Sequence, residues 1–398
     1  MATVGEVGSV RPLRSRRRQT GKLLVLLAAG CLTTMTGGIV SPILPEMIQQ
    51  LQLNPQWAGM LVSMHAITIA IFTPLFGILA DRVGPLRVMI PSLCLYAVFG
   101  TAGAFMGSFW PLLAARGLLG AASGAVAAAS IGLLGTMYQG EVRSRVLGYA
   151  TSAMTTASIL VPLLGGWVGQ IQWQYAFYLY GLGLPLACVA APILANRSSQ
   201  RASSLEAGQT QTLIKILRQP RTLRLLLLLA LASGIVYAVI VYTPLYLKAT
   251  IAAGPQLNGM VLALRGIGAA IASALLASRM GKAIGVNRTI ALGFVVMALT
   301  LGVLPFQTDI HSIMLTALLF GAGFGIVVPS LYDQLANEAP HELRASVMAI
   351  GTGGNSLGQF LSPVILGPIW HAFGFTAVFF VAAGVALSVG AVNMVRKR

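Results

Sequence analysis

The order of apolar and polar positions along the 398 residues is dominated by long apolar runs that carry very few charges. A helix needs roughly 20 consecutive apolar residues to cross the hydrocarbon core of a bilayer. Twelve runs approach or exceed this length, and they lack the alternation that a barrel strand requires, so they predict transmembrane helices. The expected spans are 22–45, 57–80, 87–107, 110–136, 147–169, 175–195, 222–247, 257–278, 289–306, 311–333, 346–370 and 375–394.

Composition supports the same fold class. Hydrophobic residues make up 56% of the chain, charged residues only 9%, and the mean hydropathy is +0.82, which is far above the range of soluble proteins. We therefore expect an all-α, polytopic membrane protein. The three cysteines fall inside predicted spans without metal-ligand spacing, so we expect neither a metal site nor a cofactor.

The placement of the basic residues predicts the topology. The formal net charge is +17, and all but three of the 26 Lys and Arg residues fall on one side when the N-terminus is placed in the cytoplasm. The three exceptions are Lys248, in an outer loop, and Arg116 and Arg265, inside spans. The positive-inside rule then makes both termini cytoplasmic, in a plasma or inner membrane. We expect the basic tail to meet anionic lipid headgroups rather than nucleic acid.

The two halves of the chain are similar to each other. Shifting the sequence by 201 residues aligns residues 116–124 with 317–325, which share two glycines four apart, and aligns Gly166 with Gly367. Two parallel repeats of six helices around a shared cavity are typical of rocker-type secondary transporters. The predicted organisation is a cytoplasmic tail over 1–20, a first bundle over 21–196, a cytoplasmic linker over 197–220 and a second bundle over 221–398.

The loop between the second and third spans resembles the signature loop, motif A, of the major facilitator superfamily. It reads Gly-Ile-Leu-Ala-Asp-Arg-Val-Gly over residues 77–84, and the similarity of span number, half-repeat and central loop covers essentially the whole chain. Pro85 and Leu86 depart from the family pattern, which usually has basic residues there. A second-half copy over 274–281 carries Ser278 at the position of Asp81. The residues that carry the resemblance are Gly77, Asp81, Arg82, Gly84 and Arg87.

The resemblance implies a latch at the inner gate. A carboxylate is stabilised at a helix N-terminus by the free N–H groups and by the macrodipole. The implied partner of Asp81 is the helix that begins near Ser346, in the other half. Gly77 and Gly84 would let the backbones approach closely. The alternative is that Asp81 and Arg82 only mark the topology.

Two further segments resemble the twelve-helix drug:proton antiporters of this superfamily. Residues 113–124 resemble motif B, with Arg116 and Gly120 as its coupling residues. Residues 148–166 resemble motif C, although Ala157 and Val161 replace two of its glycines. The expected gate in the fifth span consists of Pro162, Gly165 and Gly166. A snorkelling arginine and an ordinary kinked helix are the alternatives.

Polar side chains inside spans are the candidates for a substrate cavity, because polar groups in the membrane are costly to bury. Asp and Glu are absent from the middle of every predicted span. Proton coupling would therefore need His65, Glu46, Asp333 or the substrate itself to titrate, and a purely structural role for His65 is equally open. The predicted cavity residues are His65, Arg116, Tyr242, Arg265, Asn355 and Gln359.

These features favour a secondary active exporter of small amphipathic organic compounds that works by alternating access, with proton antiport as the candidate coupling. The alternative is a specific organic-anion or metabolite carrier that uses Arg116 and Arg265. The histidines are scattered and no Walker-type glycine loop is present, so we expect no enzyme and no catalytic residues. The expected partners are a small-molecule substrate, the lipid bilayer and protons, for a monomer that does not bind nucleic acid.

Overall fold

The computed structural model describes residues 13–138, 140–194, 207–340 and 343–395, and within these ranges it contains helices and short connections but no strand. The first half consists of α1 (Leu13–Gly38), α2 (Val40–Gln50), α3 (Pro55–Ala58), α4 (Met60–Val83), α5 (Pro85–Ala102), α6 (Phe109–Met137), α7 (Gly140–Gly169), α8 (Trp173–Tyr178) and α9 (Gly183–Leu194). The second half follows with α10 (Ala207–Leu217), α11 (Pro220–Ile251), α12 (Pro255–Ala272), α13 (Ser278–Ile284), α14 (Val286–Val303), α15 (Ile310–Asn337) and α16 (Arg344–Val395).

The predicted spans are confirmed. Eleven helical segments in the described ranges are long and apolar enough to cross a membrane, and the last one, Ser346–Met394, contains two of the predicted spans. These two spans are separated at Gly374, whose φ of 78° breaks the helical course inside α16. Glycine adopts this conformation readily because it has no Cβ atom. The protein is therefore an all-α, multi-pass membrane protein.

The predicted linker contains a helix that its composition does not predict. Residues 207–217 form α10, with Leu213 and Ile216 on the side that packs against the second half. The polar composition of the surrounding segment concealed this short amphipathic pattern. Residues 1–12 of the basic tail and residues 195–206 around the start of the linker lie outside the described residues.

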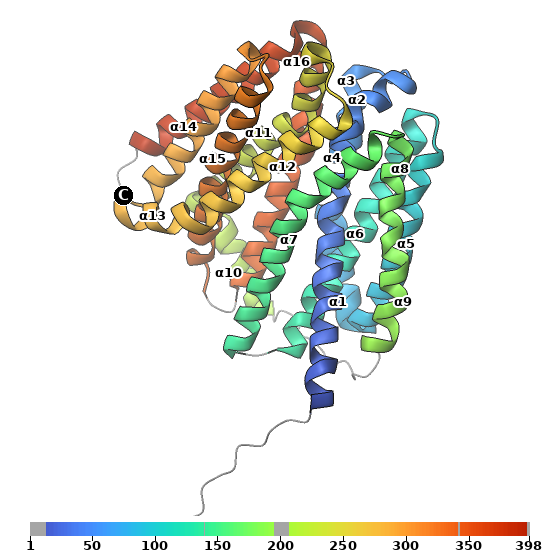
Figure 1. Ribbon diagram of the computed structural model, residues 1–398. Helices are drawn as coiled ribbons and strands as arrows, with labels where there is room; N and C mark the ends of the chain where they lie inside the picture. Colours follow the sequence, from blue (N-terminus) through green and yellow to red (C-terminus); the bar gives the residue numbers. More distant parts are fainter. Residues whose placement is uncertain (1–12, 139, 195–206, 341–342, 396–398) are drawn as a thin grey trace, which may run out of the picture.

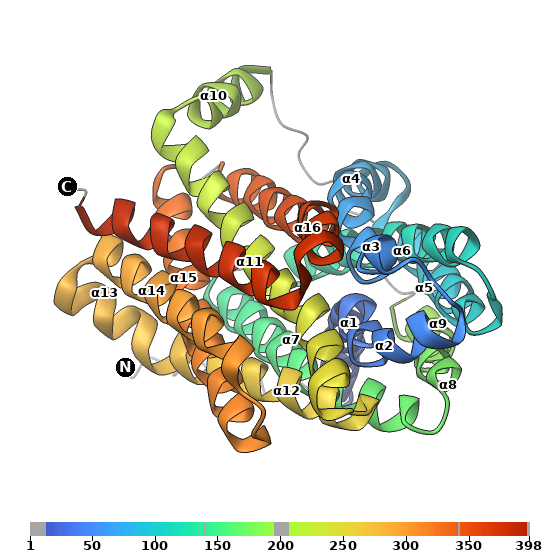
Figure 2. The ribbon, with the colours of Figure 1, turned by 90° about the horizontal axis from the view of Figure 1, so that it is seen from above.

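Figure 2 shows the two halves side by side, with α4 next to α16 and α7 next to α12. Helix α2 also contacts α11 of the opposite half. In Figure 1 the helices α1, α5 and α6 run upright, whereas α12, α14 and α15 run obliquely. The two halves are thus separate bundles that meet along a junction.

Two glycines mark equivalent positions in the repeat and correct one alignment. Gly84 has a φ of 98° and breaks the chain between α4 and α5, and Gly285 has a φ of 87° and breaks it between α13 and α14. They are 201 residues apart, the shift of the sequence repeat. The second-half copy of motif A is therefore 278–285 and not 274–281. In this alignment Lys282, rather than Ser278, stands at the position of Asp81.

Candidate functional site: the junction between the two halves

Glycines allow the two bundles to touch at one end of the junction. A Cβ atom added at Gly166 of α7 would collide with the carbonyl oxygen of Pro255 in α12, and one added at Gly259 would collide with that of Pro162. Backbone approaches backbone here, as small residues permit. Pro162 and Gly166, two residues of the expected gate, therefore lie at this crossing. Their role as a gate stays a prediction.

The repeat places a second crossing of the same kind between α16 and α3. A Cβ atom at Gly367 would collide with the carbonyl oxygen of Gln56, and one at Gly59 would press on the ring of Pro363. Gly367 and Pro363 are the partners of Gly166 and Pro162 in the 201-residue repeat. Two pseudo-symmetric crossings therefore hold the bundles together. We call the end of the junction that contains them the closed end.

Charged and amide side chains join the halves at the closed end as well. Glu46 of α2 and Lys248 of α11 form a salt bridge with an Oε1–Nζ distance of 3.0 Å. Asn258 of α12 donates its amide N–H to the carbonyl oxygen of Pro42, at 3.1 Å. These bonds fix the first span against the start of the second bundle.

A proline supplies another acceptor at this end. Pro244 has no N–H, so it leaves the carbonyl of Ile240, four residues earlier in α11, without its helical donor. The hydroxyl of Ser41, in the opposite half, donates to that carbonyl oxygen. The proline in α11 therefore frees an acceptor for a hydrogen bond across the junction.

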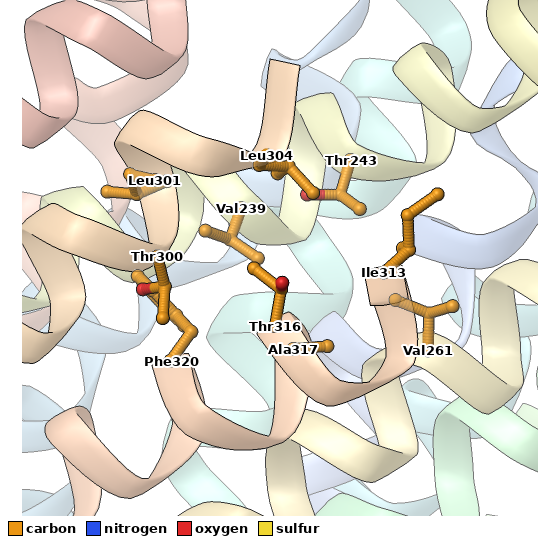
Figure 3. Close-up of a pocket in the computed structure, with 10 residues that line it drawn as sticks. All are labelled: Val239, Thr243, Val261, Thr300, Leu301, Leu304, Ile313, Thr316, Ala317 and Phe320. Atoms are coloured by element: carbon orange, nitrogen blue, oxygen red, sulfur yellow. The ribbon is translucent and has the colours of Figure 1, made fainter. Parts of the chain in front are cut away.

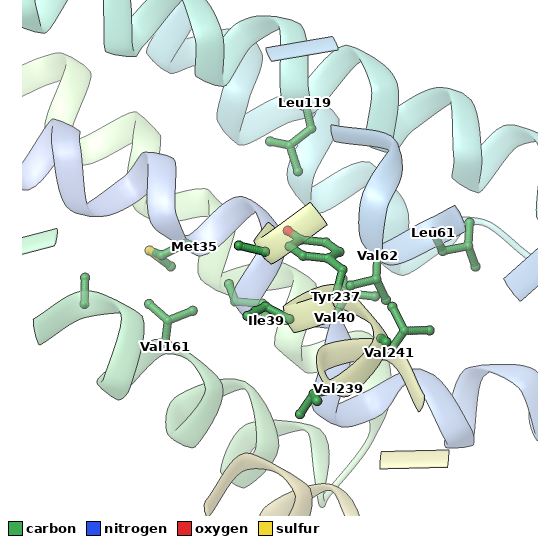
Figure 4. Packing of buried hydrophobic residues seen from close by; sticks show 14 of the residues in the cluster. Met35, Ile39, Val40, Leu61, Val62, Leu119, Val161, Tyr237, Val239 and Val241 are labelled. Carbon is green, nitrogen blue, oxygen red and sulfur yellow. The ribbon is translucent and has the colours of Figure 1, made fainter. Parts of the chain in front are cut away.

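His65 and Tyr237 meet at the middle of the junction. The Nε2 atom of His65 in α4 lies 3.4 Å from the hydroxyl oxygen of Tyr237 in α11, and both side chains are buried. In Figure 4 the Tyr237 ring lies among Ile39, Val40 and Val62 of the first half. The Nδ1 atom of His65 has no hydrogen-bond partner among the described residues.

Arg265 lies on α12 at nearly the equivalent place in the second half. Gly120 of α6 lets α4 approach at His65, and Gly321 of α15 lets α12 approach at Arg265, since a Cβ at either glycine would collide with backbone. The Arg265 side chain is half-buried, and its Nε atom has no partner within the described ranges. His65, Tyr237 and Arg265 thus add polar side chains to the middle of the junction.

Arg116 lies inside the first bundle rather than at an open surface. It is only 1% exposed, and it donates from Nε to the carbonyl oxygen of Leu61 at 2.8 Å and from Nη1 to the hydroxyl of Tyr180 at 2.9 Å. Its Nη2 donates to the carbonyl oxygen of Thr36. The guanidinium therefore joins the first, second, fourth and sixth spans.

The remaining predicted cavity residues have different surroundings. Tyr242 is 1% exposed and packs edge to face against Trp370, with ring centroids 5.7 Å apart. Asn355 accepts a hydrogen bond from the hydroxyl of Ser233 in the same bundle. Gln359 is half-buried and has no hydrogen bond among the residues described. Of these three side chains, only that of Asn355 has a hydrogen bond to another described residue.

The predicted latch is not engaged in this conformation. Asp81, Arg82 and Arg87 are exposed, and Asp81 forms no hydrogen bond or ion pair in the described ranges. A Cβ atom at Gly77 would have no heavy atom within 4 Å, so no helix packs closely there. Arg344, at the start of α16, is also exposed. The latch itself stays a prediction for another conformation.

A small cavity inside the second bundle is not a substrate site. Figure 3 shows its lining side chains, which converge from α11, α12, α14 and α15. Its volume is about 20 Å³, close to that of a single water molecule. Only three of its lining residues, Thr243, Thr300 and Thr316, carry polar side chains.

Sequence reasoning missed several residues of the junction. Tyr180 binds Arg116 from a short turn after α8, and no pattern in the sequence identifies it. The partnership of Glu46 with Lys248 was also missed. The 201-residue repeat offered a signal, since these residues lie 202 positions apart and so occupy neighbouring places in the two halves.

Comparison with known families agrees with this architecture. Residues 26–254 and 246–397 match the family described as the Major Facilitator Superfamily. The chain belongs to the Major Facilitator Superfamily. It is therefore a transporter and not an enzyme.

Curated relatives in this superfamily are similar over nearly their full length. Quinolone resistance protein NorA of Staphylococcus aureus is 24% identical over 362 residues, which cover 91% of this chain and 92% of the relative. Multidrug resistance protein MdtG of Citrobacter koseri is 24% identical over 382 residues, covering 93% and 94%.

Solved structures share the fold. A bacterial homolog of the human lysosomal transporter Spinster, in an inward-facing and occupied conformation, matches with a TM-score of 0.79 at 13% identity, covering 97% of both chains. A D-xylose–proton symporter matches with a TM-score of 0.77 at 16% identity, covering 94% of this chain and 97% of that one.

Proposed function

We propose that this Major Facilitator Superfamily member exports small amphipathic organic compounds by alternating access, with proton antiport as its coupling. The observation that carries the proposal is the asymmetry of the junction. At one end glycine crossings and the Glu46–Lys248 pair join the halves, while at the other Asp81 and Arg344 are exposed. The names of NorA and MdtG, which refer to quinolone and multidrug resistance, support a drug-like cargo.

The orientation in the membrane follows from the placement of charge. The motif A end carries the basic loops, and the positive-inside rule assigns such loops to the cytoplasm. The conformation described here is then the one open to the cytoplasm, in which an exporter loads its cargo. Both termini are cytoplasmic in this orientation, and the protein works as a monomer in the plasma or inner membrane.

The test of export is transport into inverted membrane vesicles that carry the full-length protein. A panel of fluorescent dyes, quinolones and organic acids should include compounds that accumulate when an ion gradient is applied. Collapse of the proton gradient with an ionophore should abolish the accumulation. Accumulation that persists without any gradient, or that occurs for no compound of the panel, contradicts the proposal.

Arg265 favours a second candidate, a carrier for organic anions. It places a guanidinium with an unpartnered Nε at the junction, and Asp and Glu are absent from the middle of every predicted span. A buried guanidinium forms charge-assisted hydrogen bonds to a carboxylate or phosphate. Arg265→Gln should reduce transport of anionic substrates at least about tenfold, since such bonds contribute ~1.5–3 kcal/mol. Arg265→Lys, which keeps the charge, is the control. If Arg265→Gln transports every compound of the panel as well as the wild-type protein does, the result favours the exporter.

A further inference from the structure

A second, larger cavity lies at the end of the second bundle, on the side away from the first bundle. Figure 2 shows its walls, α13 and α14, at the edge of the molecule opposite α5 and α6. Its volume is about 760 Å³, which is within the range of small-molecule sites. The side chains that give it chemical character are Lys282, Asn287, Arg288, Gln334 and Met394.

The cavity is basic and its cations are unpaired. Lys282 and Arg288 both line it and are exposed, and neither forms an ion pair or hydrogen bond with any described residue. Its lining includes no carboxylate. The amide of Gln334 donates to the Oδ1 atom of Asn287 at 3.0 Å, which ties the end of α15 to the start of α14. The walls are therefore held together while the two positive charges remain available.

The backbone adds positive potential to the same place. Helix α14 is 18 residues long and starts directly after Gly285, and no side chain caps its N-terminus. The first N–H groups of a helix have no partner within the helix, and with the macrodipole they favour an anion. The cavity is lined by Gly285, Val286 and Asn287, the residues that carry these groups.

The repeat supplies an independent reason to expect an anionic ligand. Lys282 stands at the position that Asp81 occupies in the first half, so the sign of the charge is reversed between the two copies. In the first half, a carboxylate stands at this position, and a carboxylate is attracted to the positive N-terminus of a helix. In the second half, the ammonium group of Lys282 is instead attracted to an anion. The cavity lies where four spans of the second bundle end. The ends of membrane-spanning helices reach the headgroup region of a bilayer. Basic pockets at this level bind acidic headgroups.

We propose that this cavity binds a phosphate-bearing anion through Lys282, Arg288 and the N-terminus of α14. The phosphate belongs either to the headgroup of an acidic lipid or to a free phosphate ion. This proposal does not depend on which cargo the protein exports.

The experiment measures thermal unfolding of the full-length protein in mild detergent. Short-chain phosphatidylglycerol, phosphatidylcholine with the same chains, and inorganic phosphate are titrated separately at constant ionic strength. The variants are Lys282→Gln, Arg288→Gln and the double variant. Arg279→Gln is the matched control, because Arg279 is an exposed cation on the same helix, α13, that does not line the cavity.

Phosphatidylglycerol should stabilise the wild-type protein and Arg279→Gln in a saturable manner. The double variant should bind it at least about tenfold more weakly, since two charge-assisted hydrogen-bond donors are lost. If inorganic phosphate stabilises the protein equally and competes, the ligand is the free ion, and if it does neither, the ligand is the lipid. Native mass spectrometry of retained lipid gives a second measure that does not depend on unfolding. The proposal is wrong if the double variant binds both ligands like the wild type, or if the wild type binds neither.

Discussion

Glu46 and Lys248 belong to different bundles, and their charged groups lie 3.0 Å apart at the closed end of the junction. The lysine is 36% exposed, so the pair contributes at most ~1 kcal/mol. Glu46→Gln or Lys248→Gln should shift the balance between conformations up to about fivefold away from this one. Distances between spin labels on the two bundles give the populations. The double variant Glu46→Lys, Lys248→Glu should restore the wild-type balance, and a swap that behaves like the single variants would argue against the pair.

Gly166 should be essential for bringing the two bundles together at the closed end of the junction. In Gly166→Ala the added Cβ collides with the carbonyl oxygen of Pro255, which is backbone and cannot rotate away. Overpacking of this kind costs about 1–3 kcal/mol, so the closed end should open about 5- to 150-fold more often. Reaction of a cysteine placed near the crossing with a thiol reagent measures the opening.

Gly148→Ala is the matched control for this substitution. Gly148 lies on the same helix, α7, and a Cβ atom there would meet no heavy atom within 4 Å. In Gly148→Ala, the cysteine placed near the crossing should react with the thiol reagent at the same rate as it does when Gly148 and Gly166 are both present. If Gly166→Ala and Gly148→Ala give the same reactivity, the crossing does not control the closed end.

Arg116 should contribute mainly to stability. Its guanidinium is buried and donates to Leu61, Tyr180 and Thr36, so Arg116→Ala leaves buried acceptors without donors. Hydrogen bonds to a charged group contribute about 1.5–3 kcal/mol each, and we expect a loss of roughly 3 kcal/mol or more in the free energy of unfolding. Thermal unfolding in detergent measures the loss, and transport is normalised to folded protein. Unchanged stability together with lost transport would assign Arg116 to coupling instead.

The membrane fold was predictable because its cause lies in local composition. Each span is an apolar run long enough to cross the hydrocarbon core of the bilayer, and the break inside α16 occurs at a glycine. Helix α10 was not predictable by that criterion, since it is short and lies in a polar segment. The position of its apolar side chains is explained only by the bundle against which they pack.

The junction was predictable only in part, because a sequence gives the depth of a side chain but not its direction. His65 and Arg265 were identified by the cost of a polar group in lipid, and they lie at the junction. Arg116 was identified by the same argument, but it points into its own bundle, where three acceptors bind it. Tyr242 was predicted and Tyr237 was not, and the two side chains differ in their directions on α11.

Asp81 should act in the conformation that is not seen here. It is exposed and unpartnered among the described residues, so Asp81→Ala should change the free energy of unfolding of this conformation by less than about 0.5 kcal/mol. If Asp81 caps the start of α16 when the motif A end closes, its loss should favour the present conformation about two- to fivefold, because a charge at a helix end contributes ~0.3–1 kcal/mol. Transport should fall, and a cysteine placed near Arg344 should react faster with a thiol reagent. Asp81→Asn, which can still cap but carries no charge, should give an intermediate rate, whereas unchanged labelling in both variants would exclude the latch and leave Asp81 as a marker of topology.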